Sequence, residues 1–327
     1  MAHDHDGDHT HDGDHTHDGQ GHEAGQGHEA GHGHRHGQGH EHGHGHGADI
    51  DWNQLAPHLE TQAELFAPLY RQALSWLADE LAEPGLIADA GSGPGVLTCL
   101  FAEVFPGARV VAVDGTAPLL DRARARADRL GLTDRFDTLA GELPDILDEL
   151  PKPADLLWAS RSLHHLGDQR AALTAFGQRL APGGTLALLE GGLPSRFLPR
   201  DLGIGRPGLQ ARLDALEEDR FTRMRTELPG SVAETEDWPG LLAAAGLRYT
   251  GSRSFLLDLP APADERARAH IAELLGRQRE SFGDVLTAED RDTLGRLLDP
   301  ADPGSVHRRP DVFVLSAHTV HTAVRPS

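Results

Sequence analysis

The sequence predicts an α/β fold in which a doubly wound, mostly parallel sheet is covered by helices on both faces. Between residues 86 and 192, short apolar runs such as LIADAG and ARVVAVDG alternate with segments of helical periodicity. A continuous apolar run is typical of a strand buried on both faces, and helices between successive strands make those strands parallel. A glycine-rich turn, DAGSGPG at 89–95, joins the first such strand to the first helix.

The other elements follow from periodicity and from helix breakers. Residues 52–83 repeat apolar side chains at intervals of three and four, which indicates one or two amphipathic helices, with Pro57 marking a start and Pro68 a break. Two segments, 193–235 and 263–298, interrupt the rhythm, and we expect them to form substrate-side or lid insertions, or else a structural or dimer surface. The remaining expected elements are helices at 96–105, 118–130, 168–180 and 238–247, a turn at 181–184, and strands at 86–91, 108–115, 136–141, 154–160, 185–192, 248–255 and 311–320.

The first 48 residues have a different composition from the rest. Fifteen of the 22 histidines lie in residues 1–46, among glycines, nine acidic residues and one arginine. Such a segment has no apolar surface to bury, so we expect a disordered tail followed by one domain over residues 49–327. Alternating imidazoles, such as His42, His44 and His46, are suited to binding a divalent metal ion outside the catalytic body.

Charge and composition exclude several classes of protein. The chain carries 51 acidic against 30 basic residues, a net charge of −21, which argues against a nucleic-acid-binding body. No apolar run approaches the ~20 residues that span a bilayer, and the start lacks the features of a signal peptide. A single cysteine, Cys99, excludes an intrachain disulfide. We therefore expect a soluble cytoplasmic protein, and the sequence leaves its oligomeric state open.

The glycine loop and two acidic residues predict a ligand site. Gly91, Gly93 and Gly95 allow close approach of a ligand to the backbone at the start of a helix. Asp114, at the end of the second strand, is placed to accept hydrogen bonds from two ribose hydroxyls. The spacing is G-x-G-x-G, which differs from the dinucleotide fingerprint G-x-G-x-x-G, and Asp89 beside the loop favours a cationic ligand over a pyrophosphate.

These residues resemble the class I S-adenosylmethionine-dependent methyltransferases over roughly residues 86–192. DAGSGPG and VVAVDGT resemble the first two motifs, AGELPDIL the segment after strand three, DLLWASRSLHHLGD the fourth motif and LAPGGTLALLEGG the strand-five motif. The resemblance implies a seven-stranded sheet whose last strand is antiparallel, with S-adenosylmethionine at the carboxyl ends of strands one and two. It also implies that Glu142 reads the adenine amino group and that Ser160 belongs to the cofactor site.

The acceptor and the catalytic groups are less defined by the sequence. The insertions and the zero net charge of 193–235 favour a small-molecule acceptor with an oxygen, nitrogen or carbon nucleophile. His164, His165 and Glu190 are candidate general bases, although the HHLGD segment also suits a structural junction in which Asp168 caps a helix. Trp158 and Cys99 are expected in the core.

Two other functions remain open from the sequence. One is a metal-handling or metal-sensing protein that uses the histidine-rich tail on a methyltransferase-like scaffold. The other is a nicotinamide-dependent oxidoreductase, which Asp89 and the missing sixth-position glycine disfavour.

Removing the histidine-rich tail distinguishes a metal-handling protein from an enzyme whose activity resides in residues 49–327. A variant that begins near residue 48 should keep its thermal shift with S-adenosylhomocysteine and lose nearly all affinity for nickel or zinc, because the tail has no apolar face with which to dock. Thermal melting and metal titration of the full and shortened chains check this. Loss of the nucleotide response on truncation, or inhibition of the shortened enzyme by a chelator, would contradict it.

Overall fold

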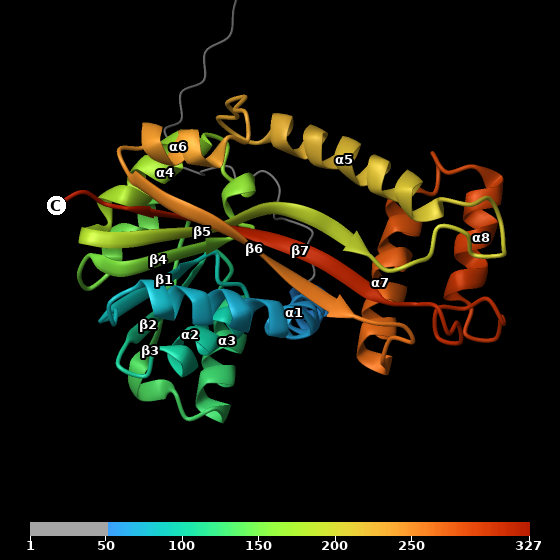
Figure 1. Ribbon diagram of the computed structural model, residues 1–327, viewed down its shortest axis with the longest axis horizontal. Coiled ribbons are helices and arrows are strands. Elements are labelled where there is room, and N and C mark those ends of the chain that lie inside the picture. The colour runs from blue at the N-terminus through green and yellow to red at the C-terminus, as the bar shows by residue number, and fades with distance from the viewer. Residues whose placement is uncertain (1–51) are drawn as a thin grey trace, which may run out of the picture. The chain divides into compact units, whose positions relative to one another are not determined.

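The computed structural model describes the backbone from Trp52 to Ser327 and the side chains from Leu55 onward. The predictions made for the histidine-rich tail, including metal binding at His42, His44 and His46, lie outside this range. Within it, the chain forms one seven-stranded sheet in the order β3-β2-β1-β4-β5-β7-β6 (Figure 1). The strands are β1 (Leu86–Ala90), β2 (Arg109–Asp114), β3 (Phe136–Ala140), β4 (Ala154–Ser160), β5 (Leu180–Arg196), β6 (Arg248–Leu259) and β7 (Val314–Val324).

The first five strands are parallel, and β7 runs antiparallel between β5 and β6. This arrangement confirms the predicted doubly wound sheet with an antiparallel last strand. The order reverses beside β1, where the chain runs outward to β2 and β3 and then returns to β4. In such sheets, ligands bind at that reversal, outside the carboxyl ends of the strands.

Helices cover both faces, and alternation along the strands separates two cores. Ile87 of β1 and Val110 of β2 face one core, whereas their neighbours Ala88 and Val111 face the other, as the two-residue period of a strand requires. The first core is covered by α1 (Trp52–Glu80), α2 (Val96–Val104) and α3 (Ala117–Arg129). The second is covered by α4 (Gln169–Gln178) and α6 (Trp238–Ala244).

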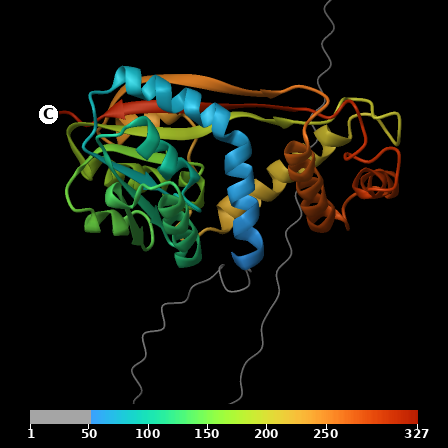
Figure 2. The same ribbon diagram turned by 90° about the horizontal axis from the view of Figure 1, so that it is seen from below.

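Helix α1 corrects the expectation that Pro57 starts a helix and Pro68 breaks one. Both prolines lie inside a single helix of 29 residues. Figure 2 shows that this helix bends sharply between its first and second halves. A proline inside a helix removes one backbone hydrogen bond and pushes away the preceding turn, which bends a helix without ending it when the faces on both sides are buried. Phe66 before Pro68, and Leu69 and Leu74 after it, are all buried.

Strand β5 corrects the expected turn at 181–184. The APGG residues belong to the strand, where the pairing with β4 shifts register between Ala154 and Leu156. Gly183 and Gly184 exchange backbone hydrogen bonds with Arg325, so the C-terminal segment holds them in the sheet. A pairing partner so distant in sequence gives no local signal, whereas Pro-Gly-Gly by itself is typical of a turn.

The two long insertions form helices at the far ends of β5, β6 and β7. Segment 193–235 contains α5 (Leu209–Glu227), and segment 263–298 contains α7 (Glu265–Phe282) and α8 (Ala288–Leu298). Figure 1 shows β5, β6 and β7 extending beyond the other strands toward these helices. No helix within residues 52–327 is long and apolar enough to cross a membrane.

Candidate functional site

The glycine loop is fixed to the end of β2 by backbone hydrogen bonds. The amides of Gly91 and Ser92 both donate to the carbonyl of Val113, at 2.8 and 3.0 Å. The Asp114 carboxylate accepts the amides of Gly93 and Thr116, at 2.9 and 2.8 Å. Each carboxylate oxygen keeps a further lone pair after these bonds, so Asp114 is both anchored and able to accept more hydrogen bonds.

The three positions of the loop require glycine for different steric reasons. All three have positive φ, a conformation that L side chains rarely adopt. A Cβ on Gly91 would lie 2.5 Å from Cβ of Ser162, and one on Gly95 would lie 2.5 Å from Cβ of Ala123. A Cβ on Gly93 would meet no atom within 4 Å. Gly91 and Gly95 therefore permit close packing, while Gly93 borders open space beside Asp114.

Asp89 lies beneath the loop and is fully enclosed. Its carboxylate accepts a 2.5 Å hydrogen bond from the hydroxyl of Thr98 on α2. Burial raises the pKa of Asp89 to about 7, an effect that the Thr98 hydrogen bond opposes and the charge of Asp114 reinforces. The sequence suggested an anionic side chain, but enclosure brings the pKa of Asp89 into the neutral range, where the charged form depends on what lies beside it.

Glu142 and Ser160 lie at the same edge of the sheet. Gly141 donates its amide to the carbonyl of Asp114, and the carboxylate of Glu142 lies against Gly115. Ser160 is the last residue of β4. Two residues on, the hydroxyl of Ser162 donates to the carbonyl of Ala90 at 2.9 Å, which ties this end of β4 to the glycine loop. The structure thus places the loop glycines and these acids at one edge of the sheet, with Ser160 at the end of the adjoining strand β4.

His164 and His165 form a short 3-10 turn after β4, at Leu163–His165. Nδ1 of His164 lies 3.3 Å from the carboxylate of Glu190 within β5. His165 is exposed, and its pKa is lowered by partial loss of hydration and by the neighbouring His164. Asp168 caps α4 by accepting the amide of Ala171, as expected.

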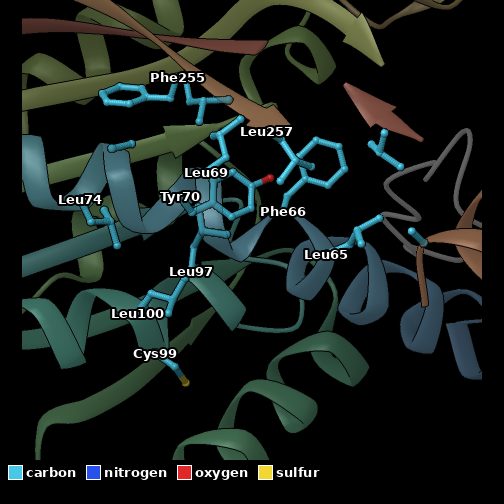
Figure 3. Close-up of a cluster of buried hydrophobic side chains, with 14 of the residues drawn as sticks. Leu65, Phe66, Leu69, Tyr70, Leu74, Leu97, Cys99, Leu100, Phe255 and Leu257 are labelled. Atoms are coloured by element: carbon cyan, nitrogen blue, oxygen red, sulfur yellow. The ribbon is translucent and has the colours of Figure 1, made fainter. Parts of the chain in front are cut away.

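A wall of buried aromatic rings comes from α1 and β7, and sequence reasoning missed it. His318 stacks on Phe66 with ring centroids 5.2 Å apart, and Tyr70 lies 6.3 Å from the same imidazole. Burial raises the pKa of Tyr70 and lowers that of His318 to about 4, and the charge of Arg161 opposes the first shift and adds to the second. Figure 3 shows Phe66 and Tyr70 on adjacent turns of α1. No local pattern could reveal this wall because its residues are about 250 positions apart.

Several other side chains are excluded from chemistry by their surroundings. Trp158 is fully buried in the core, as expected. Cys99 is also buried, and desolvation raises its pKa to about 12, so the thiol is not a nucleophile at neutral pH. In the part of the chain that the structure describes, no group of three or more His, Cys, Asp or Glu residues is arranged to hold a metal ion.

The fold is that of a doubly wound α/β protein, and comparison with known proteins identifies the family. The pattern of the methyltransferase domain matches residues 88–186. A trans-aconitate 2-methyltransferase of Streptomyces avermitilis is 30% identical over 75% of this chain and 92% of its own length. One from Methylobacterium radiotolerans is 33% identical over 63% of this chain and 82% of its own length.

The chain belongs to the class I S-adenosylmethionine-dependent methyltransferases, and it is a methyltransferase enzyme. This sets aside the nicotinamide-dependent oxidoreductase that the glycine loop left open. Some matches are partial: a tRNA 5-carboxymethoxyuridine methyltransferase of Escherichia coli is 33% identical over 36% of this chain and 47% of its own length. The likeness to a Streptomyces coelicolor trans-aconitate 2-methyltransferase spans 50% of that protein.

The glycines predict separable effects on stability. Gly93→Ala should lower the free energy of unfolding by roughly 1–2 kcal/mol, the cost of a left-handed conformation. Gly95→Ala should lose about 1–3 kcal/mol more, because its Cβ also overlaps Ala123. Urea denaturation of the two variants measures the difference. Equal losses would contradict the open space beside Gly93.

Asp89 predicts a pH-dependent stability. Its folded pKa is raised above the unfolded value, so its contribution to stability is complete below about pH 4 and is lost as the pH rises to about 7. Asp89→Asn should therefore become more stable than the wild type between pH 4 and 7, by on the order of 1–4 kcal/mol, and the difference should then level off. Asp137→Asn, at an exposed ion pair with Arg109, is the control. A difference in unfolding free energy between Asp89→Asn and the wild type that did not change with pH would refute the raised pKa of Asp89.

Proposed function

We propose that this enzyme binds S-adenosylmethionine at the glycine loop and transfers its methyl group to a small-molecule acceptor. The observation that carries the proposal is the open space at Gly93, bordered by the anchored carboxylate of Asp114 and underlain by Asp89. A left-handed glycine with free space on its Cβ side is what close approach of a ligand to the backbone requires.

The residues at this edge fit the groups of that nucleotide. Asp114 has lone pairs for the two ribose hydroxyls, and Glu142 lies near enough to Gly115 to serve as the acceptor for the adenine amino group. Asp89 supplies negative charge for the cationic amino-acid part. The hydroxyl of Ser92 is buried without a partner among the described residues, which suits a site completed by a ligand. Ser160 ends β4, the strand next to β1.

The contribution of the protein is mainly positioning. When bound, S-adenosylmethionine supplies a methyl group on a positively charged sulfur, which is already an activated leaving group. The chain must hold an acceptor in line with that bond and exclude water, and such positioning can supply about 7–11 kcal/mol of the barrier reduction. We propose that the wall of Phe66, Tyr70 and His318 faces the acceptor side, with Arg161 nearby.

A small acceptor is favoured over a nucleic acid. The relatives that match along most of their length are named for trans-aconitate, whereas the tRNA-modifying relative matches over 47% of its length. The net charge of −21 also opposes binding of a polyanion. The histidine-rich tail remains a proposed metal-binding appendage, separate from this activity.

Calorimetry with three nucleotides tests the cofactor assignment. S-adenosylmethionine and S-adenosylhomocysteine should bind with micromolar-scale affinity, and NAD should not bind. Asp114→Ala should weaken binding by roughly 5- to 150-fold, since two ribose hydroxyls and the Gly93 amide lose their partner, about 1–3 kcal/mol. Asp137→Ala, on the neighbouring strand β3 but in a surface ion pair, should bind as the wild type does. NAD binding without a response to either sulfur nucleotide would overturn the proposal.

A further inference from the structure

A part-buried histidine and a buried glutamate form a pair beside the carboxyl end of β4, where Ser160 is level with Leu189 of β5. Oε2 of Glu190 lies 3.3 Å from Nδ1 of His164, and Glu190 is only 5% exposed. The pair is close to the glycine loop in the fold, because Ser162, two residues before His164, packs on Gly91 and donates to the carbonyl of Ala90. The pair therefore adjoins the proposed nucleotide site.

Both members of the pair are held by further contacts. The other oxygen of Glu190 accepts the backbone amide of Leu163 at 3.2 Å, which orients the carboxylate. Arg225 of α5 donates to the carbonyls of His164 and Leu166, at 2.7 Å each, and so fixes the turn that carries the imidazole. Phe221, one helical turn earlier on α5, makes an edge contact with the His164 ring, with centroids 5.4 Å apart.

This geometry selects one tautomer of the neutral imidazole. A carboxylate accepts hydrogen bonds, so Nδ1 of His164 must carry the proton that Glu190 receives. The second nitrogen, Nε2, then keeps its lone pair and can accept a proton. His165 has no carboxylate partner of this kind among the described side chains, so of the two histidines on this turn His164 is the one prepared as a base.

We propose that Glu190 is a positioning residue that holds His164 as the general base of the methyl transfer, and that the acceptor is a small hydroxyl compound. This inference rests on the proposed function and names the substrate class of that site.

The protons and electron pairs of the methyl transfer balance without any other reagent. The O–H bond of the acceptor breaks, its proton forms an N–H bond at Nε2 of His164, and the oxygen electron pair forms the new bond to the methyl carbon. The electron pair of the broken carbon–sulfur bond stays on sulfur. Glu190 stabilises the imidazolium, which returns its proton to water after the product leaves.

A hydroxyl acceptor fits this pair better than a carboxylic acid does. A carboxylic acid with a pKa near 4 is already ionised at neutral pH and needs no base. A second carboxylate would also be repelled by the buried charge of Glu190. The other titratable or charged groups facing the pair are His165 on the same turn, Arg161 after β4, Arg225 on α5 and His321 on β7.

Nuclear magnetic resonance of histidine rings in the full chain tests the pairing directly. The His164 signals are those that disappear in His164→Gln. At neutral pH they should show the Nδ1-protonated tautomer in the wild type, and a mixture of tautomers in Glu190→Gln, whose amide can donate as well as accept. Glu234→Gln breaks a surface ion pair with Arg170 and is the matched control, with an unchanged His164 tautomer. A wild-type ring protonated on Nε2, or a Glu190→Gln ring like the wild type, would overturn the proposal.

The fate of a labelled methyl group tests the acceptor class. S-adenosylmethionine carrying a radioactive methyl group is incubated with the enzyme and the small-molecule fraction of a cell extract. Label on a hydroxyl forms an ether that resists mild alkali, and hydriodic acid releases it. Label that alkali releases as methanol identifies an ester and would overturn the hydroxyl assignment. Glu190→Gln should slow ether labelling at least tenfold.

The nucleotide response separates this inference from the proposed function. Glu190→Gln should keep the wild-type thermal shift with S-adenosylhomocysteine, because Glu190 lies outside the group of Asp89, Asp114 and Glu142. A variant with a normal shift and a normal His164 tautomer would refute the pairing alone. A wild type without any shift would refute the nucleotide assignment instead.

Discussion

The hydrogen bonds between the glycine loop and the end of β2 are the constraint on which the site depends. Two loop amides share the carbonyl of Val113, and a third is held by the side chain of Asp114. These bonds leave the loop no freedom to collapse into the space beside Gly93. They also orient Asp114, so the same carboxylate that shapes the loop is offered to a ligand.

Side chains packed against the glycine loop also fix the end of the neighbouring strand β4. Gly91 fits against Ser162, and Ser162 donates to Ala90, so the end of β4 cannot move independently of β1. The turn that carries His164 begins directly after Ser162. The positions of the histidine–glutamate pair and of the proposed nucleotide site are therefore coupled through a few close contacts, in a region where a one-carbon change is expected to be felt.

Asp89 near the end of β1 and His318 on β7 show how burial changes the charge of a side chain. Enclosure brings the pKa of Asp89 close to neutrality, where a cationic ligand can favour its ionised form. Enclosure lowers the pKa of His318, so that this ring is neutral and stacks on Phe66. The two shifts share a cause, since loss of water disfavours the charged form of either group.

The sequence by itself determined the doubly wound sheet, the glycine loop and the acids at the ends of β1 and β2 and after β3. These features depend on local periodicity, on glycine at positive φ and on the rule that parallel strands end at one edge, all of which are visible within about 60 residues. Tertiary structure decided the rest. Whether Pro68 ends or bends α1, and whether 181–184 turns or pairs, depended on burial and on hydrogen bonds from Arg325. The pairing of Tyr70 with His318, and the choice of His164 over His165, required contacts between distant segments, because a side chain acquires its partner and its pKa only when another element packs against it.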